Sequence, residues 1–333
     1  MDVSELLDGL NDQQREIVAA PLQNMLVLAG AGSGKTRVLV QRIAWLMKVE
    51  QASPHSILAV TFTNKAAAEM RSRVEQVVEG NVHGMWVGTF HGLAHRLLRM
   101  HFQEANLPQA FQVLDSDDQL RLVKRIIRSL NLDEKRWPAK QAQWYINGKK
   151  DDGIRPHHID SQYDPTEQTF VQIYSAYQQA CDRAGLVDFA ELLLRAHELW
   201  LNNPVLLAHY QQRFAHILVD EFQDTNAIQY AWLTLLGKGR SNVMIVGDDD
   251  QSIYGWRGAK IENIQRFLKD FDQAQTIRLE QNYRSTANIL NAANKLIANN
   301  NNRLGKELWT QDDAGEKISI YTAFNEIDEA RFI

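Results

Sequence analysis

Short apolar segments recur along the chain and predict buried β-strands. They are rich in valine, isoleucine and leucine, and they lead into glycine, threonine or aspartate, as parallel strands do where they enter functional loops. We expect six strands before residue 281, at Met25–Ala29, Ile57–Thr61, Met85–Gly88, Ile217–Val219, Val243–Val246 and Thr276–Leu279.

Helical patterns separate several of these strands. Val38, Leu39, Ile43 and Leu46 fall on one face of a helix after the first strand, and Ala66–Val78 has a second apolar face after the next strand. Alternation of strand and helix favours an α/β fold, in which crossover helices connect the strands of a parallel sheet.

The middle of the chain interrupts that alternation. Between Phe90 and Phe214 the pattern is almost entirely helical, and this stretch is long enough for a domain of its own. Because strand-like runs resume at Ile217, we predict an all-helical domain inserted into the sheet domain. The predicted boundaries are 1–89 with 215–280 for the sheet domain, 90–214 for the insertion and 281–333 for the start of a further domain.

The C-terminal segment contains two more predicted elements. Lys317–Ala323 is patterned as a strand, and Glu326–Ile333 begins a helical pattern. The pattern stops at Ile333 without a cap or a polar tail, so we expect the final domain to be represented only by its first, truncated segment.

Composition narrows the class of protein. Hydrophobic residues make up 44% and charged residues 23% of the chain, which is typical of globular proteins and excludes disorder as the dominant state. The single cysteine, Cys181, excludes an internal disulfide and fits a reducing compartment. No apolar run is long enough to span a bilayer, and Met1–Glu5 is acidic rather than signal-like, so we predict a cytoplasmic protein without membrane contact.

The net charge of −5 argues against a uniformly basic nucleic-acid-binding surface. If the chain binds nucleic acid, it needs a local basic groove or aromatic side chains on which bases can stack.

The most specific motif is a phosphate cradle between the first strand and the helix after it. Its residues are Ala29, Gly30, Ala31, Gly32, Ser33, Gly34, Lys35 and Thr36. Glycines allow backbone N–H groups to approach phosphate oxygens, and the helix N-terminus adds partial positive charge. In such a loop the lysine reaches the β- and γ-phosphates, and the Thr36 hydroxyl is a ligand of Mg²⁺. The alternative is a glycine-rich turn without a ligand.

Two acidic residues at the end of a later strand complement the cradle. Asp220 is predicted to hold Mg²⁺, and Glu221 to polarise the attacking water. The alternative is that the two carboxylates only cap the next helix. Gln251 follows another strand and three aspartates, and its neutral amide suits contact with the γ-phosphate or its water, although ordinary loop chemistry is an alternative.

Seven segments carry a family resemblance. In order and spacing they resemble the motifs of superfamily 1 DNA helicases of the UvrD/Rep/PcrA group. The segments are Leu10–Gln14, Ala29–Thr36, Ala59–Ala67, Val87–His91, Val219–Asp224, Gly247–Gly258 and Leu279–Ser285.

The resemblance implies an ATP-dependent 3′→5′ DNA helicase with RecA-like domains, acting in DNA repair with ATP and Mg²⁺. It assigns adenine recognition to Gln14, stacking on the base to Tyr283, a γ-phosphate contact to Arg284 and an assisting position to Arg37. The permanent charge and planar shape of arginine suit phosphate oxygens. For Arg284, an ion pair with Glu280 is the alternative.

The same resemblance implies a single-stranded DNA track and contact with single-strand/double-strand junctions. Phe62, Tyr254 and Trp256 are predicted to lie in loops, where aromatic rings can stack on bases of any sequence. The remaining predicted track residues are Thr63, Thr89, Phe90 and His91. In the helicase family the inserted domain meets the duplex, and here it contains Trp144, Tyr145, Lys149 and Lys150.

Two other functions stay open at this point. One is a nucleotide-switched DNA-binding module without motor activity, and the other is the helicase subunit of a recombination nuclease. Because the family places further motifs in the rest of the second RecA-like domain, we expect these 333 residues to bind ATP weakly and not to unwind DNA alone.

Overall fold

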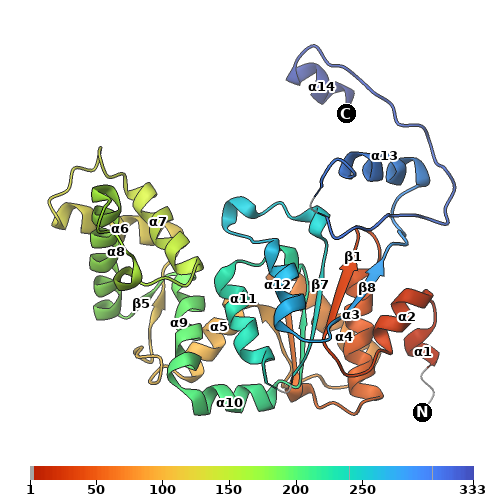
Figure 1. The fold of residues 1–333 in the computed structure, drawn as a ribbon, viewed down its shortest axis with the longest axis horizontal. Coiled ribbons are helices and arrows are strands. Elements are labelled where there is room, and N and C mark those ends of the chain that lie inside the picture. The colour runs from red at the N-terminus through yellow and green to blue at the C-terminus, as the bar shows by residue number, and fades with distance from the viewer. Residues whose placement is uncertain (1–3, 240, 302) are drawn as a thin grey trace.

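The computed structural model describes residues 4–239, 241–301 and 303–333; Met1–Val3 of the predicted N-terminal segment lie outside them. It is built around a six-stranded sheet with the order β3-β2-β6-β7-β1-β8, in which every neighbouring pair is parallel (Figure 1). This confirms the α/β class and the six predicted strands, whose ends differ from the expected ones by at most one residue. The strands are β1 Met25–Ala29, β2 Ile57–Thr61, β3 Trp86–Thr89, β6 His216–Val219, β7 Asn242–Gly247 and β8 Gln275–Leu279.

Helices cover both faces of the sheet. Alternate strand residues point to opposite faces, so Leu26 and Leu28 enter one apolar core while Met25 and Val27 enter the other. One core is shared with α2 Asp12–Val18, α3 Lys35–Lys48 and α4 Asn64–Val78, and the other with α5 Phe90–Met100, α9 Phe189–Asn202, α10 Pro204–Arg213, α11 Ala227–Gly237 and α12 Glu262–Asp270. Burial on both faces explains why the strand sequences are continuously apolar.

The stretch between β3 and β6 is helical and partly has a core of its own. Its three outer helices, at the left of Figure 1, enclose a separate apolar cluster that includes Val123, Ile146 and Tyr177. They are α6 Ser116–Ser129, α7 Ala139–Asp151 and α8 Pro165–Ala184. Two short strands, β4 Gln112–Val113 and β5 Leu186–Val187, pair in parallel beside them. Cys181 is free, as expected for the single cysteine, and it is buried in this cluster.

The helical stretch is attached to the sheet region by polar contacts as well as by α5 and α9. Asn226, the N-cap of α11, donates to Asp151 at 3.1 Å, and Lys260 forms an ion pair with Asp152 at 2.7 Å. Both aspartates lie at the C-terminal end of α7. These contacts bridge the two parts of the molecule above the sheet edge.

The C-terminal segment departs from one prediction. α13 Ala287–Ile297 and α14 Glu326–Phe332 form, but Lys317–Ala323 is not a strand. Ile318 and Ile320 alternate with polar Lys317 and Ser319, yet both isoleucines are exposed. A strand needs a partner for its backbone hydrogen bonds, and none of the described strands lies beside this segment. The short α1, Ser4–Leu7, precedes α2. Among the described residues, no helix is both long and apolar enough to cross a bilayer.

Candidate functional site

Three loops meet at one edge of the sheet. Strands β6, β7 and β1 are adjacent and parallel, so the segments that follow them open on the same side (Figure 1). In open parallel sheets this is the edge where ligands bind. The loops contain the predicted cradle, the acidic pair Asp220 and Glu221, and Gln251. Ala29 and Gln251, 222 positions apart in the sequence, are therefore brought to the same edge by strand order.

The cradle has the backbone geometry of an anion site. Gly32 and Gly34 have φ values of 70° and 86°, in the left-handed region that favours glycine. Gly34 is the N-cap of α3, so the helix begins at Lys35. Within the described chain, the backbone N–H groups of residues 34–36 have no hydrogen-bond acceptor. Free donors at a helix N-terminus are the features that bind phosphate.

The end of β6 lies directly against the cradle. The Lys35 amine forms an ion pair with Glu221 at 3.0 Å, and Gln223 donates to the same carboxylate oxygen at 2.7 Å. Glu221 has a φ of 49°, which is strained for a residue with a side chain and is typical of functional sites. The ion pair shows that the lysine side chain turns toward the acids at the neighbouring strand end.

The acids at this edge are not fully neutralised by Lys35. Burial raises the pKa of Asp220 to about 6, and the charge of Glu221 adds to the effect. The pKa of Asp224 is raised to about 6 for the same two reasons. A partly buried carboxylate beside a second one favours binding of a cation. Carboxylate and hydroxyl oxygens are the ligands that Mg²⁺ prefers, so Asp220 and the Thr36 hydroxyl fit that ion.

The predicted base-binding residues lie on the outer side of the cradle. Tyr283 is half exposed, its hydroxyl accepts a hydrogen bond from Asn11 at 2.8 Å, and its backbone N–H donates to Gly32 at 2.9 Å. Gln14 is buried, and its amide bonds the Ser33 carbonyl at 2.9 Å as well as the backbone N–H of Asn11. Gln14 thus braces the cradle here and presents no free group to a base.

The two predicted arginines remain available. Arg284 is exposed, and its Cβ lies only 2.8 Å from where a Cβ on Gly32 would stand. No acidic side chain of the described chain forms an ion pair with it, so the alternative pairing with Glu280 is not formed. Arg37, in the first turn of α3, is exposed as well.

Gln251 lies at the end of the loop after β7. Its side-chain amide donates to the Asp248 carboxylate, and its backbone N–H donates to the Asp248 carbonyl at 3.0 Å. The backbone N–H of Asp248 in turn donates to Gln223 at 3.0 Å. Gln251 is therefore connected through Asp248 and Gln223 to the Lys35–Glu221 pair.

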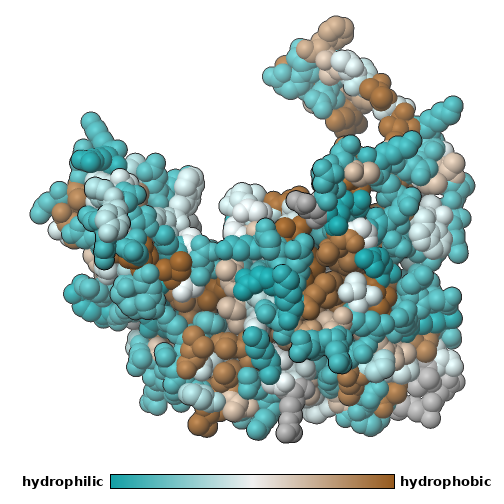
Figure 2. All heavy atoms as spheres, in the orientation of Figure 1, coloured by the Kyte–Doolittle hydropathy of each residue, from teal (hydrophilic) through white to brown (hydrophobic). Residues whose placement is uncertain are grey.

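A groove of about 1140 Å³ opens beside these loops, between the helical stretch and the sheet region. In Figure 2 it lies within the deep hollow between the left part of the molecule and the central body. Phe62 and Tyr254 line it with their rings 5.0 Å apart, and Trp256 lines it with 76% of its surface exposed. The Arg257 guanidinium lies 4.6 Å from the Trp256 ring. The groove thus offers aromatic faces and one arginine, and three aspartates, Asp151, Asp152 and Asp224, also line it.

Other predicted track residues line the same groove in supporting positions. The hydroxyls of Thr63 and Thr89 cap α4 and α5, so only their backbones are free to contact a ligand. The Phe90 ring is 7% exposed and packs edge-on against Trp232 beneath the groove. Burial lowers the pKa of His91 to about 4, so its imidazole is neutral at physiological pH.

The helical side of the groove contributes aromatics that the predicted track did not include. Phe189, 56% exposed, begins α9 with its ring 6.0 Å from His91, and Trp144 of α7 is 65% exposed. The sequence gives no signal for Phe189, because helical periodicity places it on the same face as the buried residues Leu193 and Ala196. Lys150, which sequence reasoning placed among the duplex-facing residues, is instead fully buried against Asp188 at 2.7 Å. It cannot reach a ligand in the groove.

Comparison with known proteins agrees with this geometry. The protein-family model described as "UvrD/REP helicase N-terminal domain" matches residues 10–272, and "UvrD-like helicase C-terminal domain" matches residues 277–333. The chain belongs to the UvrD/REP helicase family. The resemblance seen in the motifs is therefore confirmed, and the parallel sheet is consistent with a RecA-like domain of this family.

Curated relatives cover the whole chain. It is 72% identical over 333 residues to "DNA helicase II" of Escherichia coli (strain K12) and 65% identical over 337 aligned positions to "DNA helicase II" of Haemophilus influenzae. It is 44% identical to "ATP-dependent DNA helicase PcrA" of Leuconostoc citreum. These alignments span 100% of this chain but 46%, 46% and 45% of the relatives. The chain therefore spans about half the length of the curated relatives it matches.

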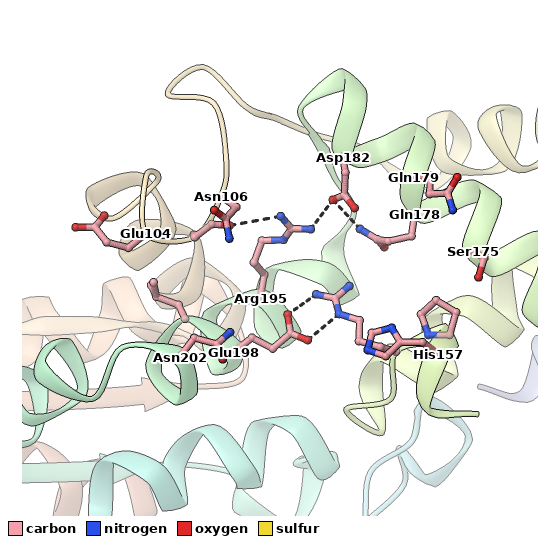
Figure 3. A pocket seen from close by; sticks show the side chains of 14 residues that line it. Glu104, Asn106, His157, Ser175, Gln178, Gln179, Asp182, Arg195, Glu198 and Asn202 are labelled. Carbon is pink, nitrogen blue, oxygen red and sulfur yellow. Dashed lines mark hydrogen bonds and ion pairs between the residues drawn. The ribbon is translucent and has the colours of Figure 1, made fainter. Parts of the chain in front are cut away.

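A second cavity, of about 710 Å³, lies within the helical stretch and differs from the groove (Figure 3). Its two arginines are already paired, Arg155 with Glu198 and Arg195 with Asp182, each at 2.6 Å. Gln178 also bonds to Asp182 at 3.1 Å. No positive charge on this wall is left for an anionic ligand, in contrast to the unpaired Arg284 at the family's motif loops.

Proposed function

We propose that this chain is the ATP- and DNA-binding part of an ATP-dependent 3′→5′ DNA helicase that moves along single-stranded DNA. The observation that carries the proposal is that the loop after β7 contacts both the nucleotide-binding edge and the groove. Gln251 is hydrogen-bonded to Asp248 at the edge where we propose that the nucleotide binds. Tyr254, three residues later, lines the groove. A change at the phosphate end of the site would therefore move a ring in the groove.

In this proposal the cradle binds the phosphates of ATP. The free N–H groups of residues 34–36 contact the phosphate oxygens, and Lys35 moves from Glu221 onto them. Mg²⁺ held by Thr36 and Asp220 would neutralise charge on those oxygens. Released from Lys35, Glu221 orients the attacking water.

The remaining nucleotide contacts come from outside the cradle. Gln251 would detect the γ-phosphate, and Arg284 would stabilise its charge in the transition state. Tyr283 would stack on the adenine, with Arg37 nearby. Gln14 would contact the base only after its amide leaves the Ser33 carbonyl.

Single-stranded DNA is the ligand that best fits the groove. Stacking on Phe62, Tyr254 and Trp256 tolerates any base sequence, as a motor that passes over every base requires. The backbones of Thr63 and Thr89, with His91 beside them, would position the strand, and Phe90 would support the groove from beneath. A neutral His91 contributes shape and hydrogen bonds rather than charge.

The larger assignments rest on family membership and remain proposals. We assign residues 1–89 and 215–280 to one RecA-like domain, 90–214 to the inserted domain and 281–333 to the beginning of a second RecA-like domain. Unwinding, junction recognition and DNA-repair partners are proposed for the whole protein. Location in the cytoplasm stays a prediction from the sequence.

The test is ATP hydrolysis by the protein with and without oligo(dT). We expect DNA to stimulate hydrolysis, and Lys35→Ala to reduce it at least about 10²-fold because a preorganised cation at the phosphates is lost. If DNA does not stimulate hydrolysis, the protein is not a motor, and the nucleotide-switched DNA-binding module is the remaining function. Because we expect these 333 residues not to unwind DNA alone, directional displacement of a labelled strand by the full-length protein then separates a helicase from that module.

The groove is tested by oligo(dT) affinity. Trp256→Ala should weaken binding by about 5- to 150-fold, because one stacked base contributes about 1–3 kcal/mol. Tyr163→Ala is the matched control, since Tyr163 is 94% exposed and does not line the groove. Equal affinities for the two variants would show that DNA does not bind on Trp256.

A further inference from the structure

A short segment after α13 crosses the same edge of the sheet. We call residues 303–309 the strap. Leu308 of the strap covers the cradle so closely that a Cβ on Gly30 would stand 2.2 Å from its side chain. The strap is also hydrogen-bonded to the segments that follow β7 and β8: Leu304 N–H to Asp249 at 2.8 Å, Glu307 N–H to the Glu280 carboxylate at 2.9 Å and Trp309 N–H to the Glu280 carbonyl at 3.0 Å.

One side chain of the strap is buried among three carboxylates. The Lys306 amine lies 2.5 Å from Asp248, 2.9 Å from Asp249 and 2.6 Å from Asp250, and only 2% of the Lys306 side chain is exposed. Arg303 binds Asp250 through two nitrogens, both at 2.7 Å. The carboxylates could share a metal ion by their spacing, and here the ammonium group fills that position.

The contact with Asp248 leads directly into the proposed catalytic groups. The second oxygen of Asp248 accepts the side-chain amide of Gln251, while the first contacts Lys306. The backbone of Asp248 is bonded to Gln223, which bonds Glu221, the partner of Lys35. A continuous series of hydrogen bonds and ion pairs therefore joins the strap to the cradle.

Charge explains why Lys306 matters in this series. Three consecutive carboxylates repel one another, and Lys306 is the cation that contacts all three and holds them turned inward, while Arg303 contacts only Asp250. Without the Lys306 ammonium group, Asp248 would turn away from its two neighbours, and its hydrogen bond to Gln251 would be lost. We propose that Lys306 is a positioning residue that fixes Asp248, and through it Gln251, at the γ-phosphate end of the nucleotide site. This inference rests on the proposed function.

The consequence concerns which nucleotide the site prefers. Gln251 can contact only a triphosphate, so ADP binding should not depend on its position. Lys306 should therefore affect discrimination between tri- and diphosphate rather than nucleotide binding in general. If Lys306 only attached the strap to the sheet edge, substituting it would change the triphosphate and diphosphate affinities equally or change neither.

The experiment measures AMP-PNP and ADP affinities with Mg²⁺ by competition against a fluorescent ADP. For Lys306→Met we expect the preference for AMP-PNP over ADP to fall about tenfold, the size of one hydrogen bond to a charged group. ADP affinity should change less than about twofold. An unchanged preference would overturn the proposal.

The matched control is Arg278→Met. Arg278 holds the same strap through the carbonyls of Gly305 at 2.8 Å and Leu304 at 3.1 Å, but it contacts none of the three aspartates. Loosening the strap in this way should leave the nucleotide preference unchanged. Equal losses in both variants would assign Lys306 a structural role and overturn the proposal.

A second variant covers the case in which Lys306→Met does not fold. Lys306→Met/Asp249→Asn removes one charge of each sign, so the buried cluster keeps its balance, and its preference for AMP-PNP should still fall. A folded double variant with the wild-type preference would overturn the proposal. If the unaltered protein binds neither nucleotide, the proposed function itself fails, which is a different outcome from wild-type binding with an insensitive Lys306.

Discussion

Two groups of buried charges in this molecule are built on opposite principles. In the helical stretch, Lys150, Arg155 and Arg195 surround Glu191 at 2.7–3.0 Å, and each lies against a carboxylate. These cations hold the pKa of Glu191 far below its usual range. At the sheet edge, by contrast, the pKa of Asp220 is raised to about 6 by burial and by its acidic neighbour.

The difference separates a scaffold from a site. A cluster whose charges neutralise one another needs no ligand once the protein is folded. Disrupting it therefore changes the free energy of unfolding. A cluster with excess negative charge is incomplete until a cation arrives, which is the usual condition of a functional site. Glu191 and Lys150 are fully buried, and the sheet-edge acids are only partly buried. The balance of charge, rather than the degree of burial, distinguishes the completed cluster from the incomplete one.

The largest expected effect comes from breaking the balanced cluster. Glu191→Gln keeps the shape of the side chain but leaves three cations without their common partner. We expect the free energy of unfolding to fall by about 3–5 kcal/mol, the usual cost of breaking a buried ion pair. Urea unfolding measures this. The control Glu167→Gln removes a more exposed carboxylate, bonded to Lys149 at 2.9 Å, and should cost less than about 1 kcal/mol. Similar losses for both would refute the distinction.

A smaller effect concerns Asp151, which lies between the two regions. Burial, with the charges of Asp188 and Asp152, raises the pKa of Asp151 to about 7. The folded state thus retains a proton that the unfolded chain releases near pH 4. Stability therefore falls as pH rises from about 4 to about 7. Asp151→Asn should remove on the order of 2 kcal/mol of this fall, less than the full linkage value because the carboxyl is only partly buried.

The measurement for Asp151 is the urea midpoint at pH 4.5 and pH 7.5 in both proteins. Asp312→Asn serves as the control, because Asp312 is an exposed residue of a C-terminal turn. An Asp151→Asn protein with the same loss of stability between the two pH values as the wild type would contradict the assignment.

The smallest expected effect is a gain in the free energy of unfolding rather than a loss. It is the most direct test of the difference between the sheet-edge acids and the Glu191 cluster. Asp220→Asn removes charge from the cluster that has too much of it, and the amide oxygen can still accept the Glu221 N–H at 3.0 Å. We expect about 1–2 kcal/mol of added stability at pH 8 in EDTA, together with loss of Mg²⁺-dependent nucleotide binding. Destabilisation instead would mean that Asp220 is already compensated, as Glu191 is.

Much of the fold could be predicted because its signals are local. Apolar runs marked the six strands, and loop motifs carried the family resemblance. The strand predicted at Lys317–Ala323 was wrong, because alternation of apolar residues expresses a preference that only a pairing partner can satisfy. Lys150 was misjudged for a related reason. A lysine in a polar stretch is ordinarily solvated, and nothing near it in sequence reveals Asp188 and Glu191, which lie 38 and 41 positions later.

The amino-acid sequence by itself determined the motif chemistry of this protein: a glycine-rich turn before Lys35, paired acids after an apolar strand, and aromatic residues in loops. Those properties depend on neighbours within a few residues of the chain. Only the tertiary structure decided which charges are neutralised, that Gln14 braces the cradle, that Phe189 lines the groove and that Lys306 reaches the three aspartates. Coulomb forces and burial act through space, so strand order and packing set their partners.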